Sequence, residues 1–113
     1  MKKFKFNLDT VLNLNRSIEK EENLNLRREM LNLKRQTDLL SEKKYQAAKI
    51  KESITNAENT GVPVQELAFW GVYLNSVNSE IDDLNGLVKL SQQRITESRA
   101  RLVKKMIARK SLE

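Results

Sequence analysis

The stretch from Trp70 to Leu102 constrains the fold most, because apolar or small residues recur along it at alternating steps of four and three. A spacing that averages 3.5 residues keeps one seam of a helix facing a partner helix, as in a coiled coil. Most residues between these positions are polar, as the solvated side of such a helix requires. The stretch therefore predicts a long helix that needs a second helix from the rest of the chain. The ten seam positions are Trp70, Leu74, Val77, Ile81, Leu84, Val88, Ser91, Ile95, Ser98 and Leu102.

The N-terminal half supplies a second and weaker seam, which begins at Leu26. Between Ile18 and Leu26 the register is ambiguous, since Asn15, Glu19 and Glu22 lie near seam positions, and a stutter or a locally loose seam is one interpretation. The predicted positions of this first-helix seam are Leu26, Met30, Leu33, Thr37, Leu40, Lys44, Ala47, Lys51 and Ile54.

Turn-forming residues cluster between residues 56 and 63, where Gly61 can close one helix and Pro63 suits the first turn of the next. Residues 4–7 are expected to be an extended lead-in, with Asn7 or Asp9 capping the helix that follows. The prediction is a single coiled-coil domain over residues 1–113, with a helix at 8–57, a turn at 58–64 and a helix at 65–109. A short connection between two long helices predicts an all-α, antiparallel coiled-coil hairpin, monomeric or weakly self-associating.

The composition disfavours most enzymatic functions. The 113 residues include no cysteine and no histidine, so the usual zinc sites and the Cys–His and Ser–His nucleophile systems cannot be built. No apolar run approaches the ~20 residues of a membrane span, and the N-terminus lacks the apolar core of a signal peptide. The sequence predicts a cytoplasmic, non-enzymatic protein without cofactor or metal.

The positive charge is concentrated at the two ends of the chain. The net charge is +6 in total, of which residues 1–16 contribute +3 and residues 92–113 contribute +5, leaving −2 for the middle. A hairpin would bring these two basic segments together, away from the turn.

Three of the six aromatic residues, Phe69, Trp70 and Tyr73, follow the turn closely. Trp70 lies on the seam, whereas Phe69 and Tyr73 lie beside it and are four residues apart. A turn near Gly61 would place Tyr45 across from about Val77. These aromatics either thicken the end of the hairpin or form a docking patch, since aromatic residues are common interface anchors.

Two segments resemble the flagellar export protein FliJ family. The first is the opening Lys3-Phe4-Lys5-Phe6-x-Leu8-x-x-Val11-Leu12-x-Leu14-x-Arg16, which is followed by acidic Glu19, Glu21 and Glu22. The second is Gly61-Val62, followed by Trp70-x-x-Tyr73-Leu74-x-x-Val77-x-x-x-Ile81.

The resemblance implies a stalk-like component of the flagellar type III export apparatus, peripheral at the cytoplasmic face of the basal body. It implies that the paired termini enter the export ATPase ring, that the region toward the turn contacts the cytoplasmic domain of the export gate, and that the protein escorts export chaperones. The residues predicted to contact the ring are Lys2, Lys3, Lys5, Lys104 and Lys105. The residues predicted to contact the gate are Tyr45, Phe69, Trp70, Tyr73 and Val77.

Three other functions remain open from the sequence. A stalk protein of a virulence type III secretion system would have the same architecture. Nucleic-acid binding by the basic ends would be strongly salt-dependent, although no aromatic residue lies among the cations of residues 94–110 and no binding motif is present. A coiled coil that grips client segments is the third alternative. No small-molecule substrate is predicted.

Overall fold

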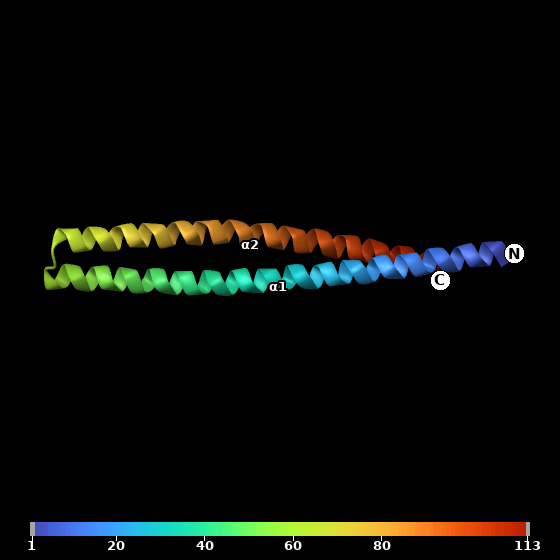
Figure 1. Ribbon diagram of the computed structural model, residues 1–113, viewed down its shortest axis with the longest axis horizontal. Coiled ribbons are helices and arrows are strands. Elements are labelled where there is room, and N and C mark those ends of the chain that lie inside the picture. Colours follow the sequence, from blue (N-terminus) through green and yellow to red (C-terminus); the bar gives the residue numbers. More distant parts are fainter. Residues whose placement is uncertain (1, 113) are drawn as a thin grey trace. The chain divides into compact units, whose positions relative to one another are not determined.

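The protein is an all-α antiparallel coiled-coil hairpin of two long helices, α1 (Lys2–Thr60) and α2 (Val64–Leu112), in a computed structural model. A short connection joins the two helices (Figure 1). The structure describes the backbone of residues 2–112 and the side chains of residues 7–112. The predicted fold class is thus confirmed.

The turn is closed by a glycine in the left-handed conformation. Gly61 has φ of 71°, where a residue without Cβ is not strained. The Val62 N–H donates to the Ala57 carbonyl at 3.3 Å, the six-to-one bond of a Schellman motif. On the other side, the Pro63 carbonyl accepts from the Glu66 N–H at 3.0 Å and opens α2. The turn spans residues 61–63, inside the predicted segment 58–64, and α1 continues past its predicted end at residue 57 to Thr60.

The chain divides into two compact units, to each of which both helices contribute. The terminal unit consists of Met1–Asn32 and Ser91–Glu113, and the turn unit consists of Leu33–Leu90. In each unit α1 and α2 run antiparallel, as the cross-helix contacts show: residues further along α1 pair with residues earlier in α2.

The seam of α2 lies where the sequence predicts it. All ten positions from Trp70 to Leu102 are buried or half-buried, while nearly all residues between them are exposed. Ser91 and Ser98 are the most completely buried side chains, each 1% exposed. The two small serines therefore lie inside the terminal unit, and the seam continues through them.

The seam of α1 differs from the prediction at three of its nine positions. Met30, Lys44 and Lys51 are exposed, and the neighbouring Glu29 and Lys43 are half-buried in their place. Thr37 is half-buried together with Gln36, and Ile50, 3% exposed, is buried where Lys51 was expected. The shared positions, which are Leu26, Leu33, Leu40, Ala47 and Ile54, fit either phase of the heptad, and the partner helix decides between them.

The first part of α1 also differs from the predictions. Of the two interpretations of the register before Leu26, the stutter is wrong, because Leu8, Leu12, Asn15, Glu19 and Glu22 continue the same four-and-three spacing and are half-buried. The other interpretation, a locally loose seam, stays a prediction. The helix also begins at Lys2, so residues 4–7 are not an extended lead-in. Neither glycine nor proline occurs before Gly61, so nothing in the local sequence breaks the helix at Asn7.

Candidate functional site

The seam of the terminal unit is held by ion pairs as well as apolar contacts. Arg109 Nε of α2 donates to Glu19 Oε2 of α1 at 2.6 Å, and both side chains are mostly buried. Arg101 Nε approaches Glu22 Oε2 at 3.5 Å. The two glutamates that made the register ambiguous in the sequence thus face arginines of the other helix, which compensates the cost of placing carboxylates in a seam.

Two buried polar atoms of the terminal unit lack a hydrogen-bond partner among the described residues. They are Glu29 Oε2 of α1 and Ser98 Oγ of α2. A buried polar atom without a partner costs about 1–3 kcal/mol. These two atoms therefore lower the stability of the terminal unit around Glu29 and Ser98.

Drawing glutamates inward leaves the outside of the terminal unit strongly cationic. Glu19, Glu22 and Glu29 are half-buried, so only Asp9, Glu21 and Glu97 are exposed acids among residues 7–32 and 91–112. In the same residues, the exposed cations are Arg16, Lys20, Arg27, Arg28, Arg94, Arg99, Arg101, Lys104 and Lys110. This outer surface can attract an anionic partner over a long range.

The predicted ring-contact residues are placed differently from one another. Lys104 is exposed on the outside of α2, whereas Lys105 is half-buried, in step with the seam positions Leu102 and Arg109. The side chains of Lys2, Lys3 and Lys5 lie outside the described residues.

The turn unit has an apolar core instead. Ala47 and Ile50 of α1 pack with Val77 of α2, and Ile54, Trp70, Leu74 and Ile81 surround them. Val77, one of the predicted gate-contact residues, is 2% exposed. The Val77 side chain packs beneath the exposed residues of this part of α2 and does not itself form part of the surface.

The three aromatics after the turn form one cluster beside this core. The ring centroids of Phe69 and Trp70 are 6.0 Å apart and those of Trp70 and Tyr73 are 6.4 Å apart, both edge to face. The Gln46 amide of α1 donates to the Tyr73 hydroxyl and ties the phenol ring to α1. Trp70 anchors the cluster in the core, while Phe69 is 66% exposed and available to a partner.

Tyr45 lies on the outer face of α1, between the seam positions Lys43 and Ala47, and is 66% exposed. Its ring carries Lys49 Nζ at 5.5 Å from the centroid, a cation–π contact within α1. The prediction places Tyr45 in the same gate-contacting set as the aromatics of α2. In the structure its recorded ring contact is with Lys49, not with that cluster.

Sequence reasoning missed two exposed valines on the same part of α2. Val72 is 70% exposed and lies one turn from Phe69, and Val64 is exposed in the first turn of α2. A signal was present, because no charged residue occurs between Glu66 and Glu80 in a chain that is 32% charged. We call the surface formed by Phe69, Val72 and Tyr73 the apolar ridge.

An ion pair borders this uncharged stretch. Lys43 Nζ of α1 lies 2.6 Å from Glu80 Oε2 of α2. The hydrogen bond to Glu80 raises the pKa of Lys43 above its usual value, against the opposing effect of desolvation. This pair links the helices at the level where the charge-free segment of α2 ends.

Neither a membrane span nor a metal cluster is found in the part of the chain that the structure describes. No helix there has an apolar stretch long enough to cross a bilayer, and no three acidic side chains are grouped so that they could hold an ion.

The fold and these two surfaces define a class: a two-helix coiled-coil hairpin with a cationic terminal unit and an apolar ridge beside its turn. The sequence model of the flagellar FliJ protein family matches residues 4–113, and the chain belongs to this family. No curated protein and no solved structure matches the chain.

Proposed function

We propose that the protein is a non-enzymatic coupling component of the flagellar type III protein export apparatus. Membership of the FliJ family, matched over residues 4–113, carries this proposal and indicates a role related to flagellar export. The coiled-coil hairpin suits a protein that links partners and does not suit one that encloses a substrate.

In this proposal the terminal unit binds the export ATPase ring. The exposed cations of that unit support it, among them Lys104, and the predicted contacts Lys2, Lys3, Lys5 and Lys105 belong to the same unit. Charge attraction acts over about 10 Å at 0.1 M salt, so it can hold a stalk in a pore without a large dry interface. We expect this contact to weaken steeply as salt is raised.

The apolar ridge is proposed to bind the cytoplasmic domain of the export gate. Phe69 and Val72 offer exposed apolar surface, and Trp70 and Val77 hold that surface in place from the core. Tyr45 on the outer face of α1 is a further proposed contact. An apolar contact of this kind should depend little on salt. The same protein is proposed to escort export chaperones, at the cytoplasmic face of the basal body.

The test is a pair of binding measurements with purified partners, the ring ATPase and the gate domain, at low and high salt. Lys104→Glu combined with Lys2→Glu, Lys3→Glu and Lys5→Glu should weaken binding to the ATPase and leave gate binding intact. Phe69→Ala should do the reverse, and Asn78→Ala, on an exposed position of the same helix, should change neither.

The result that contradicts the proposal is equally direct. If wild-type protein binds neither partner under any salt condition, a coupling role in export is wrong. If the lysine reversals abolish both contacts while Phe69→Ala changes neither, one electrostatic surface replaces the two-surface arrangement.

A further inference from the structure

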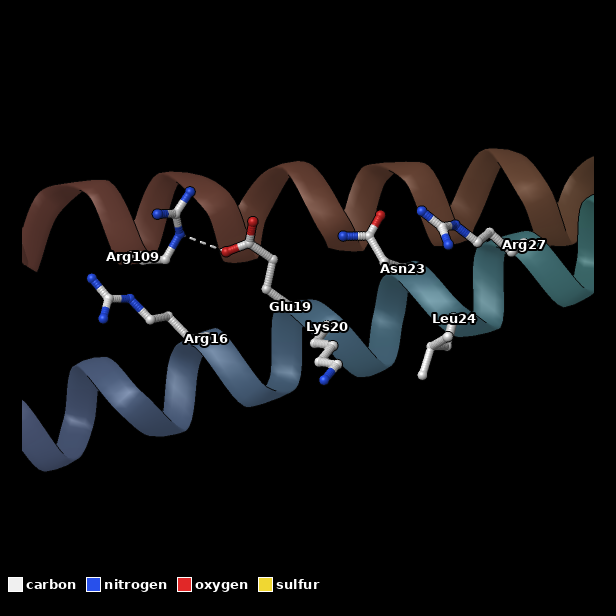
Figure 2. Close-up of a pocket in the computed structure, with 7 residues that line it drawn as sticks. All are labelled: Arg16, Glu19, Lys20, Asn23, Leu24, Arg27 and Arg109. Atoms are coloured by element: carbon white, nitrogen blue, oxygen red, sulfur yellow. Dashed lines mark hydrogen bonds and ion pairs between the residues drawn. The ribbon is translucent and has the colours of Figure 1, made fainter.

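A groove in the terminal unit combines positive charge with an exposed leucine. It has a volume of about 510 Å³ and is lined by Arg16, Glu19, Lys20, Asn23, Leu24 and Arg27 of α1 and by Arg109 of α2. In Figure 2, Asn23 and Arg27 are directed toward α2, whereas Lys20 and Leu24 are directed away from it. Cationic groups therefore stand on both sides of the groove.

The only acid lining the groove is already neutralised. Glu19 accepts from Arg109 at 2.6 Å, as the dashed line in Figure 2 marks. Lys20 and Arg27 are exposed, and neither has a recorded ion pair with a described residue. The groove thus keeps its positive charge and can attract an anionic group.

Two properties of the groove select among anionic partners. The seven residues that line it include no aromatic side chain on which a nucleic-acid base could stack. Leu24, 45% exposed, offers an apolar contact that a phosphate backbone would not use. A peptide segment with both carboxylates and an apolar side chain fits both properties.

We infer that this groove binds an acidic, amphipathic helical segment of a partner protein. Lys20 and Arg27 are seven residues apart on α1, which corresponds to about 10.5 Å at 1.5 Å per residue, and Leu24 lies between them. A helical ligand matches this spacing with Glu at positions i and i+7 and Leu at i+3 when it runs antiparallel to α1, or at i+4 when parallel. The inference adds a second partner to the cationic surface that is proposed to bind the ring: Lys20 and Arg27 belong to that surface, but the groove uses none of the five lysines assigned to the ring contact.

The probe is a fluorescein-labelled helical peptide with Glu at i and i+7 and Leu at i+3 and i+4, and binding is followed by fluorescence anisotropy on the full chain. Its control is a peptide of the same composition with the two glutamates on opposite faces. We expect the first peptide to bind and the control to bind about tenfold more weakly, as for two exposed ion pairs at low salt.

A matched pair of variants locates the binding. Lys20→Gln with Arg27→Gln should weaken peptide binding about tenfold, whereas Arg99→Gln with Lys110→Gln removes the same charge from exposed positions outside the groove and should change it less than twofold. Circular dichroism confirms that both variants stay helical. Leu24→Ser should also weaken binding without any change of charge.

Three results would overturn the inference. Equal losses in the two charge variants would mean diffuse attraction. Equal binding of the two peptides would mean that spacing is not recognised. Binding of phosphatidylserine vesicles or duplex DNA that is stronger than that of the peptide, and equally lost with Lys20 and Arg27, would make the groove a general polyanion site. The ATPase and gate measurements do not depend on any of these results.

Discussion

The terminal unit and the turn unit use the same coiled-coil spacing with opposite chemistry. The turn unit buries Ile50 and Val77 and, apart from the half-buried Lys43, leaves its charged residues outside. The terminal unit buries Ser91 and Ser98, places glutamates in the seam, and leaves apolar side chains such as Ile107 exposed. The core of the turn unit is thus mainly apolar, whereas the seam of the terminal unit combines apolar, hydroxyl and charged side chains.

The difference teaches how the two units of one hairpin can serve distinct purposes. Burying apolar surface at about 25 cal/mol per Å² stabilises the turn unit whatever the salt concentration. Ion pairs in the terminal unit contribute less and depend on salt. The same inward glutamates leave the outer surface cationic, so that a salt-dependent seam and a capacity to bind anionic partners have one cause.

The largest expected loss of stability follows from a substitution in the core of the turn unit. Ile50→Ala should lower the free energy of unfolding by about 2–4 kcal/mol, because it opens a cavity beside Ala47 and Val77. Urea denaturation followed by circular dichroism measures this. Tyr45→Ala, on the outer face of the same helix, is the control and should stay within about 0.5 kcal/mol. Equal effects would mean that the apolar core does not hold this unit.

A smaller effect is expected for the ion pair of the terminal unit. A double-mutant cycle with Glu19→Gln and Arg109→Gln should give a coupling energy of about 1–2 kcal/mol, since both side chains are mostly buried. The coupling energy should decrease between 0.05 M and 1 M salt. A coupling energy of zero at both salt concentrations would remove the ion pair as a determinant of the seam.

Ser98→Ala should have little effect or a favourable one. The substitution removes a buried hydroxyl that has no hydrogen-bond partner among the described residues, so the free energy of unfolding should stay the same or rise by about 1 kcal/mol. Thermal unfolding measures it against Ser53→Ala, which removes a hydroxyl bonded to the Lys49 carbonyl. A marked loss of stability in Ser98→Ala would show that the hydroxyl has an essential partner.

The smallest expected effect on stability comes from the ion pair of Lys43 with Glu80, and it appears only at alkaline pH. The hydrogen bond to Glu80 raises the pKa of Lys43 in the folded protein, so its contribution to stability is complete below the ordinary lysine pKa of about 10.4 and disappears as pH rises through the raised value. Glu80→Gln should lower the pKa of Lys43, measured by NMR. An unchanged pKa would mean that the pair does not persist in solution.

The seam of α2 could be predicted because its own residues are apolar or small at all ten positions. The phase of the α1 seam could not, since Glu29 and Met30 fit the heptad equally well when α1 is considered alone. The arginines of α2 decide it, because Arg101 and Arg109 make glutamates acceptable in the seam. A contact between residues about 80–90 positions apart leaves no periodic signal in either helix.

The candidate surfaces, like the two seams, could be predicted from the sequence only in part. Aromatic residues after the turn indicated a patch, and the structure brings Phe69, Trp70 and Tyr73 together. Burial of Val77 and exposure of Val72 depend on which side of α2 faces α1, and they follow from the confirmed seam. The groove beside Leu24 could not be predicted, because it requires α2 to pass at the level of Glu19.

Hydrogen exchange of the free protein at about 0.05 M and 1 M salt tests most directly whether the two units are held by different forces. At 1 M salt the screening length falls to about 3 Å, so the seam ion pairs weaken while apolar burial does not. Backbone amides of residues 15–29 and 95–109 should then exchange several-fold faster, and those of residues 40–57 and 70–88 should exchange at the same rate or more slowly. Acceleration of both units alike, or of the turn unit alone, would contradict the account.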